Sequence, residues 1–439
     1  MKVLFLFLNK SFKYIYYKLI LPISKLIEQF WTIKIQLFYK NRKTLERLKG
    51  KKCIECLFIV SDIADWKCDS VFTLMLKNER FNPRVLIAPA VNYNSELLIY
   101  KQKQCVDFFS SKQYSFIVAF NAEEKKYINV KKELNPDIIF YTIPYKAVSD
   151  KRYYISNLRD SLGVYIPYAF SNNCNLNYQY DLLFHNLVWR YYVESEEHLS
   201  YFKQVSRCKG ISGVVTGYPA IENLIRAHEK RSYESWKIDN RSLKRIIWAP
   251  HHTIERKGIV VYSCFLEYAH FMVQMAQKYQ NEIQIAFKPH PLLRPKLNEL
   301  WGKEKTDTYY KCWEEMPNTS LCEGDYVDLF LTSDAMIHDS GSFITEYLYV
   351  NKPVMRTIND IPLSSMYNSF TLKSLDQYYL ARNTKDVEQF IENIIKGIDP
   401  LKEQRTSFIN EVLMPQKSPS QSIIENILDS IDNQILYCN

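Results

Sequence analysis

The stretch 335–356, AMIHDSGSFITEYLYVNKPVMR, carries the signals for two strands and one helix in close succession. Its first four residues, three of them apolar, predict a buried strand, and the small polar residues 339–342 predict a tight loop. FITEYLYV has helical composition, and the Asn-Lys-Pro turn at 351–353 leads into a second apolar run. A strand, a loop, a helix and another strand in this order form the repeating unit of a parallel, doubly wound sheet.

Similar apolar runs occur along the rest of the chain. They predict strands of one sheet at 56–60, 84–88, 116–120, 137–141, 163–168 and 188–193, and strands of a second sheet at 245–249, 284–288, 335–338 and 353–356. Continuous apolar strands that alternate with helices indicate parallel sheets covered on both faces. The polar segment EKRSYESWKIDNRS lies between the two series, so we place the junction within 218–243.

A chain of 439 residues is too long for a single ordinary core. We therefore predict an α/β protein with two Rossmann-like, doubly wound domains at 51–230 and 241–415. Residues 1–50 are predicted to form a basic amphipathic extension. Residues 416–439 are predicted to form a helix that packs back across the domains.

The positive charge of the chain is concentrated at its beginning. Residues 1–52 contain 13 Lys/Arg and two Glu, a net charge of +11, whereas the whole chain carries +9, so the remaining residues carry −2. A near-neutral body with one basic arm does not suit a nucleic-acid-binding protein. The ten cysteines show no regular spacing, so Cys53 and Cys56 are interpreted as reduced thiols rather than as zinc ligands.

The basic arm also has an apolar stripe with helical spacing. Apolar residues recur at three- and four-residue steps from Phe12 to Ile33, and lysines interrupt every window long enough to span a bilayer. Such a stripe suits a helix that lies in the headgroup region of an anionic membrane surface. The alternative is that the stripe packs on the protein's own body or on a partner. We expect a peripheral protein on the cytoplasmic face of the cell membrane.

Residues 339–342 are the first candidate for a binding site. A loop of small residues at the start of a helix presents free backbone N–H groups, and the helix dipole favours an anion there. Ser340, Gly341 and Ser342 are therefore predicted to hold a diphosphate, and Glu346, one turn along the helix, to bind ribose hydroxyls. An ordinary serine N-cap followed by an exposed Glu explains this loop, taken alone, equally well.

Two histidine-containing segments favour the anion-binding interpretation. WAPHHTI places His251 and His252 at the end of one predicted strand, and FKPHPLL places Lys288 and His290 at the end of another. Ligands bind at the carboxyl ends of the strands in an open parallel sheet, so we expect the three histidines to lie at one edge beside the loop 339–342. Nearby acidic residues match no metal motif, and we predict neither a metal nor a cofactor.

Four segments resemble the CDP-glycerol glycerophosphotransferase family, of the teichoic acid polymerase type, and they occur in the family's order. VVTGYPAIENL (214–224) resembles its TGYPRND segment, WAPHHTI its YAPTWR element, FKPHPLL its KLHP element, and 333–354 its TDYSSVxFDxxxxxKP signature. The chain departs from this pattern where His251, His252 and Thr253 replace Thr-Trp-Arg and where Glu346 replaces Asp. The HGTPLK motif of the family's base is not found, and YIPYAFSNN (165–173) is expected in the equivalent region.

The resemblance implies a GT-B architecture and a transferase, with an acceptor domain at 51–230 and a nucleotide-donor domain at 241–415. It also implies that Asp339, Gly341 and Ser342 belong to the loop that binds the donor diphosphate. An acceptor hydroxyl on a cell-surface polymer or a lipid-linked acceptor would attack the β-phosphorus of a CDP-polyol donor, and CMP would leave. His251, His252 and His290 would be catalytic, with His251 or His252 as the base, and Lys288 would contact the donor. Two alternatives stay open: a GT-B glycosyltransferase that uses a UDP- or GDP-sugar in surface polysaccharide synthesis, and a non-catalytic scaffold in polysaccharide assembly.

Overall fold

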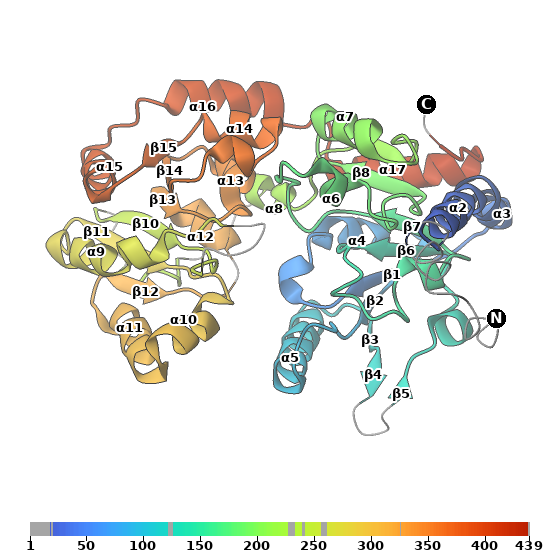
Figure 1. Cartoon of the computed structure of the whole chain (residues 1–439), viewed down its shortest axis with the longest axis horizontal. Helices are drawn as coiled ribbons and strands as arrows, with labels where there is room; N and C mark the ends of the chain where they lie inside the picture. Colours follow the sequence, from blue (N-terminus) through green and yellow to red (C-terminus); the bar gives the residue numbers. More distant parts are fainter. Residues whose placement is uncertain are drawn as a thin grey trace. The chain divides into compact units, whose positions relative to one another are not determined.

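The computed structural model describes residues 18, 21–121, 126–226, 233–238, 242–255, 261–324 and 326–437 (Figure 1). The chain divides into two compact units. Unit 1 contains the described residues of Met1–Ala169, Leu176–Pro219 and Lys417–Asn439, and unit 2 contains those of Phe170–Asn175 and Ala220–Gln416. The main sheet of each unit is parallel, as the apolar runs predict.

The main sheet of unit 1 has seven strands. In spatial order they are β3 (Phe116–Val118), β2 (Phe81–Ile87), β1 (Ile54–Val60), β6 (Ile138–Tyr141), β7 (Leu162–Tyr165), β8 (Arg190–Val193) and β9 (Gly213–Val215). The chain moves outward from β1 to β3 on one side and from β6 to β9 on the other, so the strand order reverses between β1 and β6.

Helices connect the strands of unit 1, as parallel pairing requires. They are η4 (Ile63–Asp65), α4 (Asp69–Leu76), α5 (Ser95–Ser111), η5 (Val130–Leu134), η6 (Ile155–Asn157), α6 (Leu176–Tyr180) and α7 (Glu196–Val205). A separate antiparallel pair consists of β4 (Phe120–Asn121) and β5 (Lys126–Tyr127).

The sheet of unit 2 has six strands, all paired in parallel. In spatial order they are β12 (Thr319–Leu321), β11 (Ile283–Phe287), β10 (Lys244–Ala249), β13 (Ala335–His338), β14 (Val354–Thr357) and β15 (Tyr379–Ala381). Its helices are α8 (Ile221–Arg226), α9 (Phe265–Lys278), α10 (Leu293–Trp301), α11 (Lys303–Glu315), α12 (Val327–Thr332), α13 (Phe343–Glu346), η7 (Tyr347–Val350), η8 (Leu363–Ser365), α14 (Ser369–Leu375), α15 (Thr384–Lys396), α16 (Lys402–Phe408) and η9 (Ile409–Leu413). The order reverses between β10 and β13.

Apolar side chains of the central strands form the two cores. In unit 1 the ring of Phe58 stacks on Phe140 at a centroid distance of 4.1 Å, and in unit 2 Trp248 stacks on Phe287 at 5.0 Å. The prediction of two Rossmann-like sheets is therefore confirmed. The edge strands β9, β12 and β15 have no counterpart among the predicted strands, because these three-residue strands lack the longer apolar run, FIVAF, that marks β3. The described cysteines are free thiols, as expected.

The last helix, α17 (Pro419–Asp432), belongs to unit 1. Ile423, Ile427 and Ile431 are fully buried in the core of that unit. The guanidinium of Arg190, at the start of β8, is fully buried and donates to Ser430 Oγ at 2.8 Å and to Asn426 Oδ1 at 3.1 Å. The C-terminal segment therefore completes the core of the N-terminal sheet.

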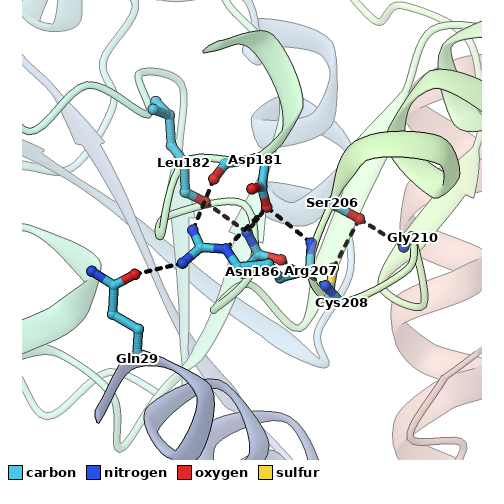
Figure 2. Close-up of polar contacts among 8 residues, drawn as sticks. All are labelled: Gln29, Asp181, Leu182, Asn186, Ser206, Arg207, Cys208 and Gly210. Carbon is cyan, nitrogen blue, oxygen red and sulfur yellow. Dashed lines mark hydrogen bonds and ion pairs between the residues drawn. The ribbon is translucent and has the colours of Figure 1, made fainter. Parts of the chain in front are cut away.

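The N-terminal arm forms α2 (Leu21–Lys34), η3 (Ile35–Lys40) and α3 (Asn41–Leu48), which belong to unit 1. The stripe residues from Phe12 to Ile20 lie outside the described residues. Figure 2 shows how a polar side of α2 is attached: Arg207 donates to Gln29 Oε1 at 2.6 Å and to Asp181 Oδ1 at 3.1 Å. No helix in the described part of the chain is both long and apolar enough to cross a membrane.

Most of the apolar stripe of α2 is exposed. Ile23, Leu26, Ile27, Phe30 and Trp31 each have more than half of their surface exposed. In contrast, Ile33 and Leu37 are buried against the unit. The exposure of Ile23 to Trp31 argues against packing of this part of the stripe on unit 1, whereas Ile33, at the end of the stripe, does pack there. Packing of the exposed part on a partner stays open.

Candidate active site

Three loops leave the sheet of unit 2 at the same edge. They follow β10, β11 and β13, which are neighbouring parallel strands, and they comprise residues 250–254, 288–292 and 339–342. These are the segments that the sequence predicts as a site. The edge also includes the reversal point between β10 and β13, where open α/β sheets bind their ligands.

The structure brings the three predicted catalytic histidines together. The ring centroids of His251 and His252 are 4.3 Å apart, those of His252 and His290 are 4.3 Å apart, and those of His251 and His290 are 5.0 Å apart. One nitrogen of each ring lies within 4.8 Å of the others, so the cluster could bind either an anion or a metal ion. The hydrogen bonds of the rings distinguish these two possibilities.

Two of the three rings have Nδ1 as a hydrogen-bond acceptor. Thr253 Oγ1 accepts the backbone N–H groups of Tyr262 at 3.0 Å and Ser263 at 3.1 Å, which occupies both of its lone pairs. Its own O–H therefore donates to His251 Nδ1, 3.1 Å away. His290 Nδ1 accepts the N–H of the residue two positions later at 3.1 Å.

It follows that the neutral rings of His251 and His290 carry their proton on Nε2. Such rings offer N–H donors and no lone pair, which suits the oxygen atoms of a phosphate better than a metal ion. Burial lowers the pKa of His251 well below its ordinary value, and the neighbouring His290 and His252 lower it further. Burial, followed by the charge of Lys296, lowers the pKa of His252 to about 4. Both of these rings are therefore neutral at pH 7.

Asp339 holds the backbone of this cluster through buried hydrogen bonds. Its carboxylate is 2% exposed and accepts the backbone N–H of His251 at 2.5 Å and that of Cys264 at 2.7 Å. Burial raises its pKa to about 6, although the two N–H donors oppose the shift. The geometry does not favour the prediction that Asp339 contacts the diphosphate. Both of its carboxylate oxygens accept backbone N–H groups inside unit 2. Asp339 positions His251.

The loop after Asp339 is fixed by a buried arginine. Arg356, in β14, donates to the carbonyl oxygens of Asp339 at 2.8 Å and Ser340 at 2.9 Å, and to the hydroxyl of Tyr367 at 2.5 Å. Its side chain is 1% exposed. Two carbonyls of the loop thus point inward to the guanidinium.

Gly341 lies where the loop is most crowded. A Cβ atom at this position would meet the ring of Tyr262 at 2.8 Å and Asn172 Nδ2 at 3.0 Å. Asn172 Nδ2 donates to the carbonyl oxygen of Gly341 at 3.0 Å. Asn172 comes from Phe170–Asn175, the short stretch that belongs to unit 2 although the residues on both sides of it belong to unit 1.

The helix that starts after Ser342 is shorter than predicted. The α-helix ends at Glu346, and η7 continues with 3₁₀ geometry to Val350. The hydroxyl of Tyr378 donates to the carbonyl oxygen of Ile344 at 2.6 Å and so occupies a group that a longer helix would use internally. Ser342 is exposed, and its side chain makes no cap hydrogen bond. The helix α13 has only one turn, so the helix dipole at this loop is small. The exposed Ser342 and the N–H groups of the nearby histidines therefore matter more for anion binding than the helix dipole does.

Lys288 and Glu346 lie deeper than expected. Lys288 is 8% exposed, and its Nζ donates to the carbonyl oxygen of Gly324 at 2.6 Å. Glu346 is 3% exposed, and its Oε2 accepts the hydroxyl proton of Tyr326 at 2.5 Å. The alternative of an exposed Glu is therefore wrong, and any ribose contact must coexist with the Tyr326 hydrogen bond.

The family of the chain follows from its sequence over unit 2 and the adjoining part of unit 1. Residues 172–423 match the model of the CDP-Glycerol:Poly(glycerophosphate) glycerophosphotransferase family, which is more than half of the chain. The protein belongs to this family. The match begins at Asn172, the residue that contacts Gly341, and it includes all the predicted site residues. No curated protein sequence matches the chain.

Solved structures agree with the fold of this glycerophosphotransferase-family protein. A variant of the wall teichoic acid polymerase TagF is similar with a TM-score of 0.57 at 12% identity, over 94% of this chain and 99% of that one. S. aureus MnaA in complex with UDP gives 0.55 at 14% identity, over 88% and 99%. UDP-GlcNAc 2-epimerase from Neisseria meningitidis, bound to UDP-GlcNAc, gives 0.54 at 13% identity, over 86% and 100%. At these identities the similarity shows the two-domain GT-B fold.

Sequence reasoning missed several residues of this transferase site. Arg356 could have been suspected, because it is the one charged residue of a short apolar strand beside His338. Thr253 and Tyr262 gave no such signal, since their roles depend on a hydrogen bond and a ring contact to groups outside their own segments. Asn172 lies in YIPYAFSNN, the stretch expected near the site, although its contact with Gly341 could not be read from spacing.

Proposed function

We propose that this protein transfers glycerol phosphate, or a similar polyol phosphate, from a CDP-activated donor to a hydroxyl of a cell-surface polymer or a lipid-linked acceptor. The observation that carries the proposal is the pair of Nε2–H donors of His251 and His290 beside the loop 339–342. The family match supports the reaction type. Neutral N–H donors fit a diphosphate, whose oxygens gain charge as the leaving group departs.

In this mechanism the acceptor oxygen forms a bond to the β-phosphorus while the bond from that phosphorus to CMP breaks. His251 and His290 donate to the phosphoryl oxygens, together with backbone N–H groups near Ser342. His252 takes the acceptor proton, because His251 Nδ1 already accepts the Thr253 hydroxyl proton and His290 Nδ1 already accepts a backbone N–H. A pKa of about 4 makes His252 a weak base, so its contribution lies at the lower end of the usual range, about 10²-fold.

The nucleotide specificity is tested by binding. A thermal-shift series with CDP-glycerol, CDP-ribitol, UDP-sugars and GDP-sugars should show stabilisation by the cytidine nucleotides. Stabilisation by UDP- or GDP-sugars alone would favour the glycosyltransferase, and stabilisation by none would favour the non-catalytic scaffold. The His251-His252-Thr253 run, in place of Thr-Trp-Arg, is the observation that keeps the glycosyltransferase in the comparison.

The catalytic assignment is tested at His290. Replacing His290 with Ala removes one donor to the phosphoryl group and should lower kcat by about 10²- to 10³-fold. His270→Ala is a matched control, because His270 lies exposed on α9, outside the three loops of the site. Unchanged turnover of a folded His290→Ala protein would contradict the assignment.

We also propose that the protein works on an anionic membrane surface through α2. The exposed stripe from Ile23 to Trp31 supports this, because a stripe of this kind is covered in the headgroup region of a bilayer. Lys25 and Lys34 lie on the same helix and would contact anionic headgroups. A cytoplasmic face for this association accords with the expected use of a CDP-activated donor.

A further inference from the structure

The three loops of the unit 2 site contain few positive charges that a donor could reach. Residues 250–254 and 339–342 contain no Lys or Arg. Lys288 and Arg356 are almost fully buried, and they donate to backbone carbonyl oxygens of unit 2. Two of the three histidine rings are neutral at pH 7, because burial lowers their pKa values. A diphosphate is negatively charged, so a cation from another segment is expected beside these loops.

Lys296 provides such a cation. It lies on α10, the helix that begins directly after the loop of His290, and the N–H of Leu293 donates to the carbonyl oxygen of His290 at 2.8 Å. Lys296 Nζ lies 2.6 Å from Oε2 of Glu255, which follows His252 by three residues. This ion pair therefore connects the segment after β10 with the helix after β11, beside two of the histidine-containing loops.

Two of the histidine rings respond to the charge of Lys296. After burial, this charge is the largest cause that lowers the pKa of His252. It also contributes to lowering the pKa of His251, for which burial is again the largest cause. Because the interaction between charges weakens with distance, the ammonium group lies near both rings.

The ammonium group of Lys296 is accessible and is bound only weakly by its partner. The side chains of Lys296 and Glu255 are 26% and 46% exposed, so both are in contact with solvent. An ion pair with this exposure stabilises a protein only slightly, because water solvates both charges well. An ammonium group has three N–H donors, so Lys296 can bind a phosphate oxygen without any change in the fold.

We propose that the ammonium group of Lys296 binds a phosphate oxygen of the donor beside the histidine cluster, and that Glu255 pairs with it when no donor is bound. This inference deepens the proposed function, on which it rests for the nature of the donor. It gives the site a positive charge that neutral N–H donors do not supply. The interaction is one between point charges at a partly exposed position, so it weakens as the salt concentration rises.

The test separates phosphate binding from a purely structural ion pair. Lys296→Gln removes the ammonium group, whereas Glu255→Gln breaks the same ion pair and keeps the ammonium group. Lys278→Gln is the matched control. Lys278 also pairs with a glutamate, but it ends α9, the helix that leads back to the opposite edge of the sheet. CDP-glycerol and UDP-glucose, which both contain a diphosphate, are titrated calorimetrically into each full-length protein.

We expect Lys296→Gln to weaken CDP-glycerol binding about tenfold, which corresponds to one partly exposed charge-assisted hydrogen bond, and to make binding less dependent on salt. Glu255→Gln should bind at least as tightly as the wild type, because a competing carboxylate is lost. Lys278→Gln should bind as the wild type does. Equal affinities of the wild type and Lys296→Gln would overturn the inference. An equal loss in Lys296→Gln and Glu255→Gln would also overturn it, because the ion pair would then only hold the two segments together.

The proposed function can fail separately from this inference. A wild type that binds UDP-glucose but not CDP-glycerol would overturn the CDP-activated donor, and the same variants would then test Lys296 with UDP-glucose. A wild type that binds neither nucleotide would overturn both proposals.

Discussion

Replacing Asp339 with Asn tests the role of the carboxylate that holds His251 of the histidine cluster in position. In the wild type one carboxylate oxygen accepts the N–H of His251 and the other accepts that of Cys264. An Asn side chain has a single acceptor oxygen, so its NH₂ group must face one of these two N–H groups. A buried N–H left without an acceptor destabilises the protein by about 1–3 kcal/mol.

A second effect has the opposite sign at high pH. Burial raises the pKa of Asp339 from 3.8 to about 6, so its ionised form is disfavoured in the folded state by on the order of 3 kcal/mol. Asn removes this penalty. At pH 8 the two effects nearly cancel, and we expect the free energies of unfolding of the wild type and Asp339→Asn to be similar.

The difference between the proteins should then change with pH. Between pH 4 and 6 the folded wild type binds more protons at Asp339 than the unfolded chain does, so its stability rises as the pH falls through 6. The variant lacks this group. The wild type should therefore gain about 3 kcal/mol relative to Asp339→Asn between pH 8 and pH 4, or roughly 6–12 °C in Tm for a unit of this size.

The assay is thermal unfolding of both proteins from pH 4 to pH 8. Asp334→Asn is the control for replacing a carboxylate by an amide, because Asp334 also accepts a backbone N–H within unit 2. Transfer activity should move in the opposite direction to stability. Protonation of Asp339 below pH 6 weakens its hold on His251, and the variant should lose about 10- to 100-fold in kcat even at pH 8. A difference in Tm that does not vary with pH would refute the raised pKa, and full activity of Asp339→Asn would refute the positioning role.

Three further predictions concern other parts of the chain. Arg356→Lys keeps the charge but loses the planar guanidinium that donates to three oxygens. It should destabilise unit 2 by about 3 kcal/mol and weaken CDP-glycerol binding in a thermal-shift assay, and an unchanged Tm would contradict this. Ile427→Ala should cost unit 1 about 2–5 kcal/mol in urea unfolding, whereas Gln421→Ala on the exposed side of α17 should change little. Phe30→Ser should reduce binding to phosphatidylglycerol vesicles by about tenfold or more, and equal loss with Ile99→Ser, an exposed residue of α5, would argue against a specific role for α2.

The sequence predicted the two sheets and the grouping of the site for a common reason. A parallel strand that is buried on both faces leaves a continuous apolar run, and parallel neighbours release their next residues at one edge. That argument alone brings His251, His252 and His290 together, as the structure shows. It needs no knowledge of side-chain contacts.

The same argument could not assign the roles of individual side chains. The family resemblance places Asp339 in the donor-diphosphate loop, yet its carboxylate points inward to an N–H 75 positions earlier in the chain. Arg356 and Asn172 fix the backbone of that loop from other segments. The short α13 has a similar origin, because a hydroxyl from Tyr378 occupies a carbonyl that local propensity assigns to the helix. Each of these features depends on a long-range hydrogen bond, which leaves no periodic trace in sequence.

The reversal point of the unit 2 sheet shows how two supporting residues prepare one ring for an anion. The Thr253 hydroxyl donates to Nδ1 of His251 and so leaves the ring proton on Nε2, while Asp339 accepts the backbone N–H of His251 and fixes the position of this residue. The ring therefore presents an N–H donor in a fixed place, which suits a phosphate oxygen better than a metal ion.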